Sequence, residues 1–93
     1  MPSASAPPRQ AVFQSEFRED LASWIREKPR VALKVLDLVE DVLRDPLHGL
    51  GKPEPLKQAL AGCWSRRVTE EHRLVYRPTD RVVHFLQCRY HYG

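Results

Sequence analysis

The second half of the chain carries acidic, cationic and imidazole side chains that could do acid–base chemistry together. Glu54 stands between two prolines, whose fixed φ restricts where its carboxylate can move. Arg67 and Arg73 lie on segments predicted as neighbouring strands, and His91 stands near the chain end. A carboxylate can take the proton from a ribose 2′-hydroxyl, so that its oxygen attacks the adjacent phosphate. Arginines can stabilise the resulting charge, and an acid can protonate the departing 5′-oxygen.

Each of these residues also has a reading without chemistry. Glu54 could be an exposed loop charge, and the final His91-Tyr92 pair could be a frayed end. The arginines could form a phosphate-binding face or a solvated one, and strand alternation puts Arg66 and Arg67 on opposite faces. The residue types alone leave an RNA-cleaving enzyme and a binding module open.

Composition excludes several other classes of protein. The chain has 93 residues, of which 42% are hydrophobic and 29% charged, as expected for one small globular domain. No apolar run is long enough for a membrane span, and the start has no apolar signal segment. Two cysteines and four histidines show no disulfide framework or zinc spacing, and Gly49–Lys52 is too short for a phosphate loop. We expect a reduced, cytoplasmic protein without a metal or cofactor.

The net charge of +3 is unevenly distributed along the chain. Residues 1–46 carry −1 and residues 47–93 carry +4, and all four histidines lie in the second part. This asymmetry favours an anionic partner such as nucleic acid, although a solvated basic surface fits it equally well.

Two helices are predicted before these residues. We expect residues 1–10 to be a flexible tail and residues 11–93 to form one domain, with a short strand at 11–13. Ser15 is a candidate N-cap, and Lys28-Pro29 should end the first helix and begin the second, which Asp45-Pro46 ends. The predicted apolar faces consist of Phe17, Leu21, Trp24 and Ile25, and of Val31, Val35, Leu38, Val39 and Val42.

Three strands are predicted after the helices, at residues 63–69, 72–77 and 81–88. Turn signals separate them at Glu70-Glu71 and at Pro78-Thr79-Asp80. The element order predicts an α+β domain in which an αα-hairpin packs on an antiparallel sheet.

Three linked motifs between Gly51 and Tyr92 give the chain a family resemblance. They read GKPEPLK, then G-x-WSRR-x-T-x-EHRLVY, and finally CRYHY. In this order and spacing they resemble the YoeB (Txe-type) toxins of the RelE superfamily. The resemblance implies a small microbial-RNase-like fold and the toxin of a type II toxin–antitoxin pair. It also implies an endoribonuclease that cuts mRNA in the ribosomal A site.

The resemblance implies a role for each residue that matches a motif. The Glu of KPEP is Glu54, the general base, and the His of the terminal YHY is His91, the general acid. The Arg of EHRLVY is Arg73, which would stabilise the phosphate, and the second Arg of WSRR is Arg67, a further phosphate or substrate contact. The last Tyr is Tyr92, which would orient the substrate or neighbouring groups.

Three further residues of the motifs are candidates for RNA contact. Lys57 could meet the phosphate backbone, whereas Lys52 and Arg66 are either RNA-facing or structural. Two differences from the family pattern stand nearby. Cys63 replaces a frequent aromatic residue, and Gly93 follows the usual terminal Tyr and could alter the efficiency of cleavage.

The resemblance also implies partners. A YefM-type (Phd-type) antitoxin would neutralise the toxin, and the complex would repress its own operon. No predicted helix has a basic recognition face, so DNA contact would come only through the antitoxin. A homodimer and a catalytically weak or inactive RNA- or antitoxin-binding module of the same fold both remain open.

Overall fold

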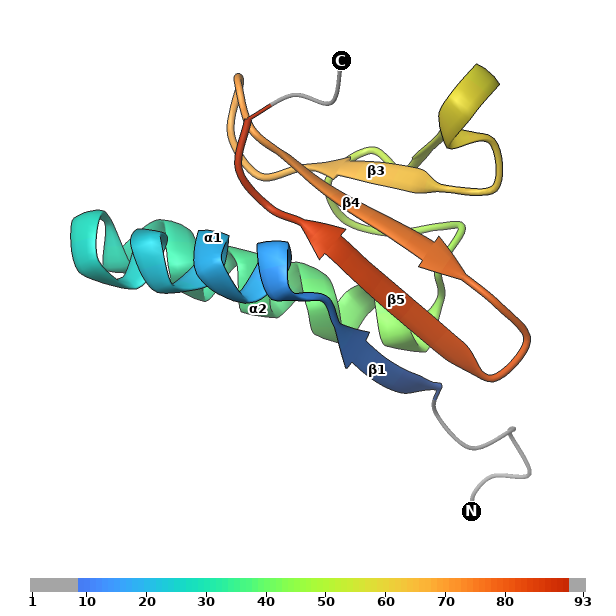
Figure 1. Cartoon of the computed structure of the whole chain (residues 1–93), viewed down its shortest axis with the longest axis horizontal. Helices are drawn as coiled ribbons and strands as arrows, with labels where there is room; N and C mark the ends of the chain where they lie inside the picture. Colours follow the sequence, from blue (N-terminus) through green and yellow to red (C-terminus); the bar gives the residue numbers. More distant parts are fainter. Residues whose placement is uncertain (1–8, 91–93) are drawn as a thin grey trace.

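The computed structural model describes residues 9–90 of the chain; residues 1–8 and 91–93 lie outside the described part. Two helices are followed by a strand-rich second half, and one strand precedes the helices (Figure 1). In chain order the elements are β1 Gln10–Phe13, α1 Ser15–Glu27, α2 Pro29–Arg44, β2 Glu54–Pro55, the 3₁₀ turn η1 Gln58–Leu60, β3 Trp64–Arg67, β4 Arg73–Pro78 and β5 Val82–Gln87.

The helix boundaries follow the predicted breaks, with one correction. Proline at position 29 begins α2, because the missing N–H costs nothing in the first turn of a helix. The prediction of Ser15 as N-cap is wrong: Gln14 holds that position without a side-chain cap. The backbone N–H of Gln14 donates to the carbonyl of Phe85, so the pairing of β1 sets where α1 starts. Neither described helix is long and apolar enough to cross a membrane.

The two helices cover one face of the sheet (Figure 1). Their apolar stripes pack on strand residues that include Leu74, Tyr76 and Phe85, each with no exposed surface. Ile25 departs from the prediction, since 54% of its side chain is exposed. It lies one helical position past Trp24, at the rim of the buried arc.

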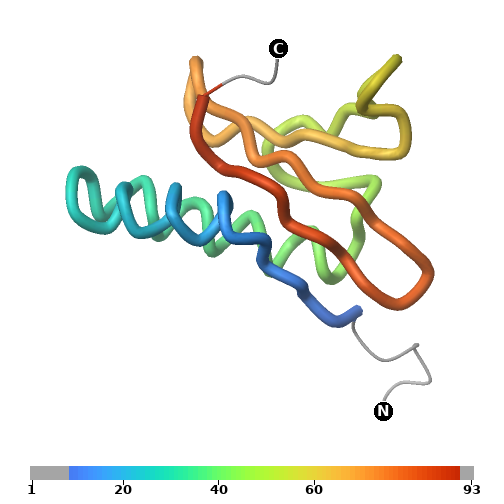
Figure 2. Tube along the Cα trace, in the orientation of Figure 1, coloured from blue at the N-terminus to red at the C-terminus, as the bar shows by residue number. Residues whose placement is uncertain are grey.

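The five strands form one sheet in the order β1-β5-β4-β3-β2. The pairs β3–β4 and β4–β5 are antiparallel, as predicted. The short β2, which was not predicted, pairs antiparallel with β3, and β1 pairs parallel with β5 and makes the sheet mixed. The two helices intervene between β1 and the rest of the sheet, and a parallel partner requires a crossover of this kind. Figure 2 shows the blue start of the described chain running beside the red final strand.

The domain begins slightly earlier than predicted. Gln10 pairs with Val82 in the sheet, and Arg9 Nε donates to the carbonyl of Thr79 at 3.3 Å. These two residues therefore belong to the folded domain, whereas the prediction placed them in the tail of residues 1–10.

Candidate active site

The sheet has a second face, opposite the helices, and this face carries most of the candidate residues. Successive side chains of a strand point to opposite sides. Arg66 and Leu74, both fully buried, point toward the helices. Arg67 and Arg73 therefore point away from them, and the register places these two arginines directly opposite each other on β3 and β4.

Glu54 lies on the same part of this face. It opens β2, is exposed, and pairs with Ser65 of β3. Ser65 and Arg67 share one strand face, so Glu54 and Arg67 occupy a diagonal position, for which Cα atoms lie roughly 7–8 Å apart. The fold thus brings a carboxylate and two guanidinium groups from three strands to one region.

The two arginines are held differently. Arg73 Nη1 donates to the carbonyls of Thr69 at 2.9 Å and Glu70 at 3.0 Å, which ties its guanidinium to the β3–β4 turn. Arg67 is half-buried, and its Nε is buried without a hydrogen-bond partner among the described residues. Unpaired buried donors are rare in native proteins, and like charges opposite each other on neighbouring strands are unfavourable. Both features fit a surface that receives an anion.

Backbone strain gathers around the candidate residues. The described chain has three residues other than glycine with positive φ: Lys52 at 54°, Gln58 at 57° and Tyr90 at 66°. Lys52 stands two residues before Glu54, Gln58 follows a candidate lysine, and Tyr90 precedes the C-terminal segment. Left-handed conformations of this kind cost about 1–3 kcal/mol each and cluster at functional sites.

His91 and Tyr92 lie outside the described residues, but the segment that leads to them is firmly held on α1. Asp20 Oδ2 accepts from the backbone N–H of Cys88 at 3.0 Å. Trp24 Nε1 donates to the Cys88 carbonyl at 2.9 Å. The last described residue, Tyr90, donates its backbone N–H to His72 Nδ1 at 2.6 Å. These contacts fix where the chain leaves the described fold.

Arg89 strengthens the same attachment. Its guanidinium donates to Ser23 Oγ at 2.6 Å and to Glu27 Oε1 at 2.8 Å. It also lies over the ring of Trp24, 4.3 Å from the centroid, and within 5.4 Å of the Tyr90 ring. Sequence reasoning missed this role, because the partners lie more than 60 residues apart in the chain.

The three candidate RNA contacts divide into two groups. Lys52 and Lys57 are exposed, on the loop before β2 and just after it. Arg66 has no exposed surface, and its guanidinium bonds internal acceptors, so RNA cannot reach it in this conformation. Of the two alternatives for Arg66, the geometry supports the structural one.

Asp41 is a buried partner of Arg66 that the sequence analysis did not single out. It is 7% exposed, and its Oδ2 accepts from Arg66 Nη1 at 2.5 Å. The backbone N–H of Leu50 is the strongest contact lowering the Asp41 pKa to about 2, with help from Arg44 and Arg66. Asp41 stands three positions after Leu38 on the buried face of α2, and this spacing is the sequence signal that could have predicted its burial.

Comparison with known proteins assigns this geometry to a family. Residues 13–92 match the family described as the YoeB-like toxin of the bacterial type II toxin-antitoxin system. The chain belongs to this family of YoeB-like toxins. Toxin YoeB of Streptomyces coelicolor is 48% identical over 80 residues, which cover 86% of this chain and 95% of that protein.

Solved structures of YoeB toxins have the same fold. The YoeB dimer of Staphylococcus aureus is 34% identical with a TM-score of 0.84, over 92% of this chain and 100% of that one. The YoeB–YefM complex from the same organism gives a TM-score of 0.81 at the same identity and coverage. The α+β, RelE-type fold predicted from the sequence is thereby confirmed.

The two cysteines of this YoeB-like chain are free and buried. Burial is the main cause that raises the pKa of the Cys88 thiol to about 12, so this thiol stays protonated and unreactive at neutral pH. Cys63, where the family often has an aromatic residue, is 6% exposed and closes the η1 turn by backbone bonds. Among residues 9–90, no group of three or more His, Cys, Asp and Glu could hold a metal ion.

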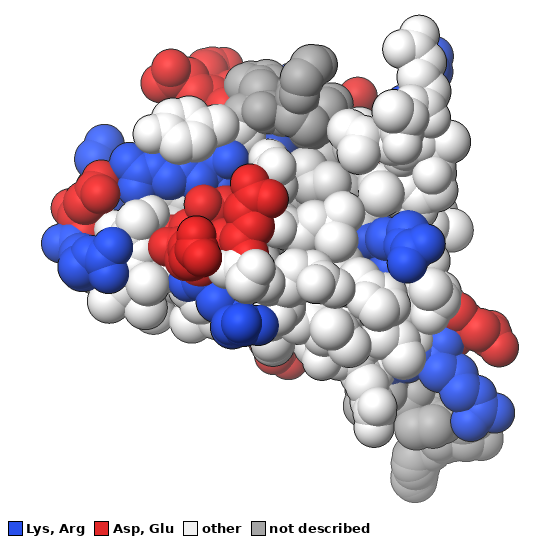
Figure 3. Space-filling view, in the orientation of Figure 1, with Lys and Arg blue, Asp and Glu red and all other residues white. Residues whose placement is uncertain are grey.

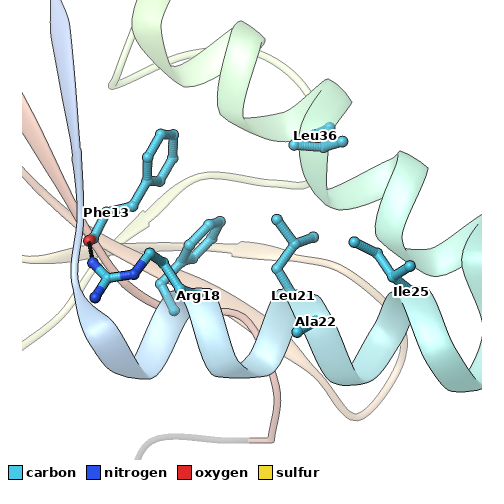
Figure 4. A pocket seen from close by; sticks show the side chains of 7 residues that line it. Phe13, Arg18, Leu21, Ala22, Ile25 and Leu36 are labelled. Atoms are coloured by element: carbon cyan, nitrogen blue, oxygen red, sulfur yellow. Dashed lines mark hydrogen bonds between the residues drawn. The ribbon is translucent and has the colours of Figure 1, made fainter.

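An apolar hollow of about 310 Å³ lies elsewhere in the YoeB-like domain, between the two helices. Figure 4 shows Leu21, Ile25 and Leu36 facing into it, while Arg18 turns to the carbonyl of Phe13. No candidate catalytic residue lines this hollow. It is therefore separate from the surface formed by Glu54 and the two arginines.

The face of the molecule seen in Figure 3 carries both signs of charge. In this view, Lys and Arg groups are dispersed and interleaved with acidic groups over α1, and they form no continuous basic patch.

Proposed function

We propose that this YoeB-like toxin is an endoribonuclease that cleaves mRNA without a metal. The observation that carries the proposal is the juxtaposition of Arg67 and Arg73 on neighbouring strands, with Glu54 diagonal to Arg67. A carboxylate beside two cations matches the needs of 2′-hydroxyl attack on a phosphate.

Each step has a proposed residue. Glu54 takes the proton from the ribose 2′-hydroxyl, and the 2′-oxygen attacks the adjacent phosphorus. Arg67 and Arg73 stabilise the charge that develops on the non-bridging oxygens. His91 gives a proton to the departing 5′-oxygen, which leaves a 2′,3′-cyclic phosphate on one fragment. The need for a 2′-hydroxyl makes the reaction specific to RNA.

Other residues bind and position the substrate. Tyr92 orients the substrate or the neighbouring acid, and the exposed Lys52 and Lys57 contact the phosphate backbone. The attachment of Cys88, Arg89 and Tyr90 to α1 and His72 holds the last described residues against the domain. The ribosome supplies further positioning, because it holds the mRNA in the A site.

The proposed setting is the bacterial cytoplasm, where translated mRNA is found. A YefM-type antitoxin would neutralise the chain, as the Staphylococcus aureus YoeB–YefM complex suggests, and the dimer of that YoeB makes self-association a further proposal. Contact with operator DNA would come through the antitoxin.

The test is induced expression in a bacterium that lacks the antitoxin, with mRNA 5′ ends mapped. We expect wild type to arrest growth and cut translated mRNA, and Glu54→Gln and His91→Ala to lose at least about a hundredfold in cleavage, as for loss of an acid or base. Glu71→Gln, an exposed carboxylate on the β3–β4 turn, is the matched control and should cleave like wild type.

Two results would overturn the proposal. If Glu54→Gln cuts as fast as Glu71→Gln, Glu54 is not the base. If soluble wild type cuts no mRNA while it binds ribosomes or antitoxin, the chain is a catalytically weak or inactive binding module of the same fold.

A further inference from the structure

The loop between α2 and β2, residues 45–53, has no regular structure, yet it leads directly to Glu54. Its two leucines do not anchor it, since Leu47 is 44% and Leu50 is 57% exposed. Pro46 is buried, but the other residues of the loop are exposed or half-buried, so polar contacts must hold most of the loop in shape.

The guanidinium of Arg66 provides that anchor from β3. Arg66 Nη2 donates to the carbonyls of Asp45 at 2.6 Å and His48 at 3.0 Å, and Nη1 donates to that of Leu50 at 3.1 Å. The second contact of Nη1 is Asp41, whose Oδ2 also accepts the N–H of Leu50 at 2.9 Å. All of these contacts are internal, because Arg66 is fully buried.

Tyr76 of β4 completes the network. Its hydroxyl donates to the carbonyl of Pro46 at 2.6 Å and accepts from Arg66 Nε at 3.1 Å. The carbonyls of residues 45, 46, 48 and 50 are thus all held by two side chains of the sheet. A planar guanidinium suits this task, whereas a lysine could not reach as many acceptors at once.

The network extends to the backbone beside the candidate residues. Gly49 and Gly51 have positive φ, and an added Cβ at Gly51 would lie 3.1 Å from the Arg66 side chain. The carbonyl of Gly51 accepts the N–H of Arg67 at 2.7 Å. The left-handed Lys52 follows at once, so the held loop determines where Lys52 and then Glu54 lie.

We propose that Arg66, with Asp41 and Tyr76, is a positioning residue for the general base. The inference rests on the proposed function: the network holds the 45–53 loop so that Glu54 stands beside Arg67. Replacing a buried ion pair by apolar residues is often neutral for stability, so stability alone is a weak reason for this pair. Holding the 45–53 loop in shape is a stronger reason for the presence of this buried pair.

The sharpest variant is Tyr76→Phe, which removes the hydroxyl and keeps the ring packing. Single-turnover cleavage of mRNA in the ribosomal A site is measured at a temperature where every variant is folded. Because misplacement of a reacting group by about 1 Å can cost up to roughly a hundredfold, we expect the maximal rate to fall about ten- to a hundredfold. The half-saturating concentration should change less than about threefold, since the RNA-contacting cations remain.

Two comparisons separate positioning from general destabilisation. Val83→Ala, buried in β5 outside the network, should lose stability and keep the maximal rate. Arg66→Lys should retain the charge and still cleave as slowly as Tyr76→Phe. A Tyr76→Phe protein that cleaves like Val83→Ala would overturn the inference.

Amide hydrogen exchange gives a readout that does not require cleavage. Exchange at Leu50, Lys52 and Glu54 should accelerate in Tyr76→Phe more than in Val83→Ala. If wild type does not cleave, the proposed function fails, and the comparison of exchange rates then tests by itself whether the network anchors the loop. Equal exchange in the two variants would then refute its anchoring by Arg66 and Tyr76.

Discussion

Individual charged residues in this toxin act through what surrounds them. Arg66 and Arg67 are neighbours in the chain, but one is buried among backbone carbonyls and the other faces a candidate anion site. Asp41 is nearly buried, with Arg66 and the N–H of Leu50 on one oxygen. The same residue type thus serves packing on one side of β3 and, in the proposed function, chemistry on the other.

Asp41 should titrate far below an ordinary aspartate. Its pKa is lowered to about 2, so its interactions stabilise the fold fully above pH 4, and the contribution is lost as the pH falls toward 2. The shift corresponds to about 2 kcal/mol. Carboxyl NMR should show a midpoint near pH 2 for Asp41. A midpoint near the ordinary value of an aspartate would contradict the buried network.

Among the structural elements, two connecting segments are held by specific contacts, just as the helices and strands are. The α2–β2 loop reaches Glu54 through residues with left-handed backbone conformations. The segment after β5 is held on α1, where Asp20 and Trp24 bond the backbone of Cys88 and Ser23 accepts from Arg89. The first connection positions Glu54 at the start of β2, and the second holds the last described residues of the chain.

Glycine at position 49 should be irreplaceable for a steric reason. At Gly49, with φ +128°, an added Cβ would stand 2.1 Å from Asp41 Oδ2; at Gly62, with φ +93°, it meets nothing within 4 Å. Gly62→Ala should cost about 1–2 kcal/mol for the backbone alone. Gly49→Ala should cost at least about 2 kcal/mol more, because the carboxylate must move.

Urea unfolding of the two variants measures this difference. Equal losses in the free energy of unfolding would mean that only the backbone conformation requires glycine at position 49, and that the Asp41 side chain can move away at no cost.

A second element, the C-terminal segment on α1, should depend on its buried contact rather than its ion pair. Trp24→Phe leaves the Cys88 carbonyl without its donor and should cost about 1–3 kcal/mol. Glu27→Gln should cost less than Trp24→Phe, because Glu27 is half exposed and an exposed ion pair contributes little to stability. Thermal unfolding compares the two, and a larger effect of Glu27→Gln would reverse this ranking.

For the molecule as a whole, one apolar core supports two surfaces on opposite sides of the sheet. The helices and their apolar hollow occupy one side, and Glu54 with the arginines occupies the other. The net charge is only +3, so long-range attraction to RNA should be modest and local cations should matter most.

Salt dependence can test this distribution of charge. Binding of a short RNA with 2′-O-methyl riboses, which cannot be cleaved, should weaken with salt. Arg67→Ala should reduce the slope of log K against log salt by about 0.7, the value for one phosphate contact to a single strand. Arg81→Ala, exposed at the β4–β5 turn, should leave it unchanged. Equal slopes for Arg67→Ala and wild type would exclude a phosphate contact at Arg67.

The two helices, the three main strands and the family could all be predicted from the amino-acid sequence. Periodicity and proline act within a few residues, so Pro29 and Asp45 mark the helix ends correctly. The linked motifs around WSRR and EHRLVY identified the family that the comparisons confirm. The roles assigned to Glu54, Arg67, Arg73, His91 and Tyr92 stay predictions.

The contacts between residues far apart in the chain are seen only in the tertiary structure. The parallel pairing of β1 with β5 joins segments about 70 residues apart, and Arg66 meets Asp41 across 25 residues. Arg89 meets Glu27 across 62 residues. Local patterns carry no information on such pairs, because each contact depends on how helices and sheet pack. Whether an arginine faces RNA or a buried carboxylate is therefore settled only when the chain has folded.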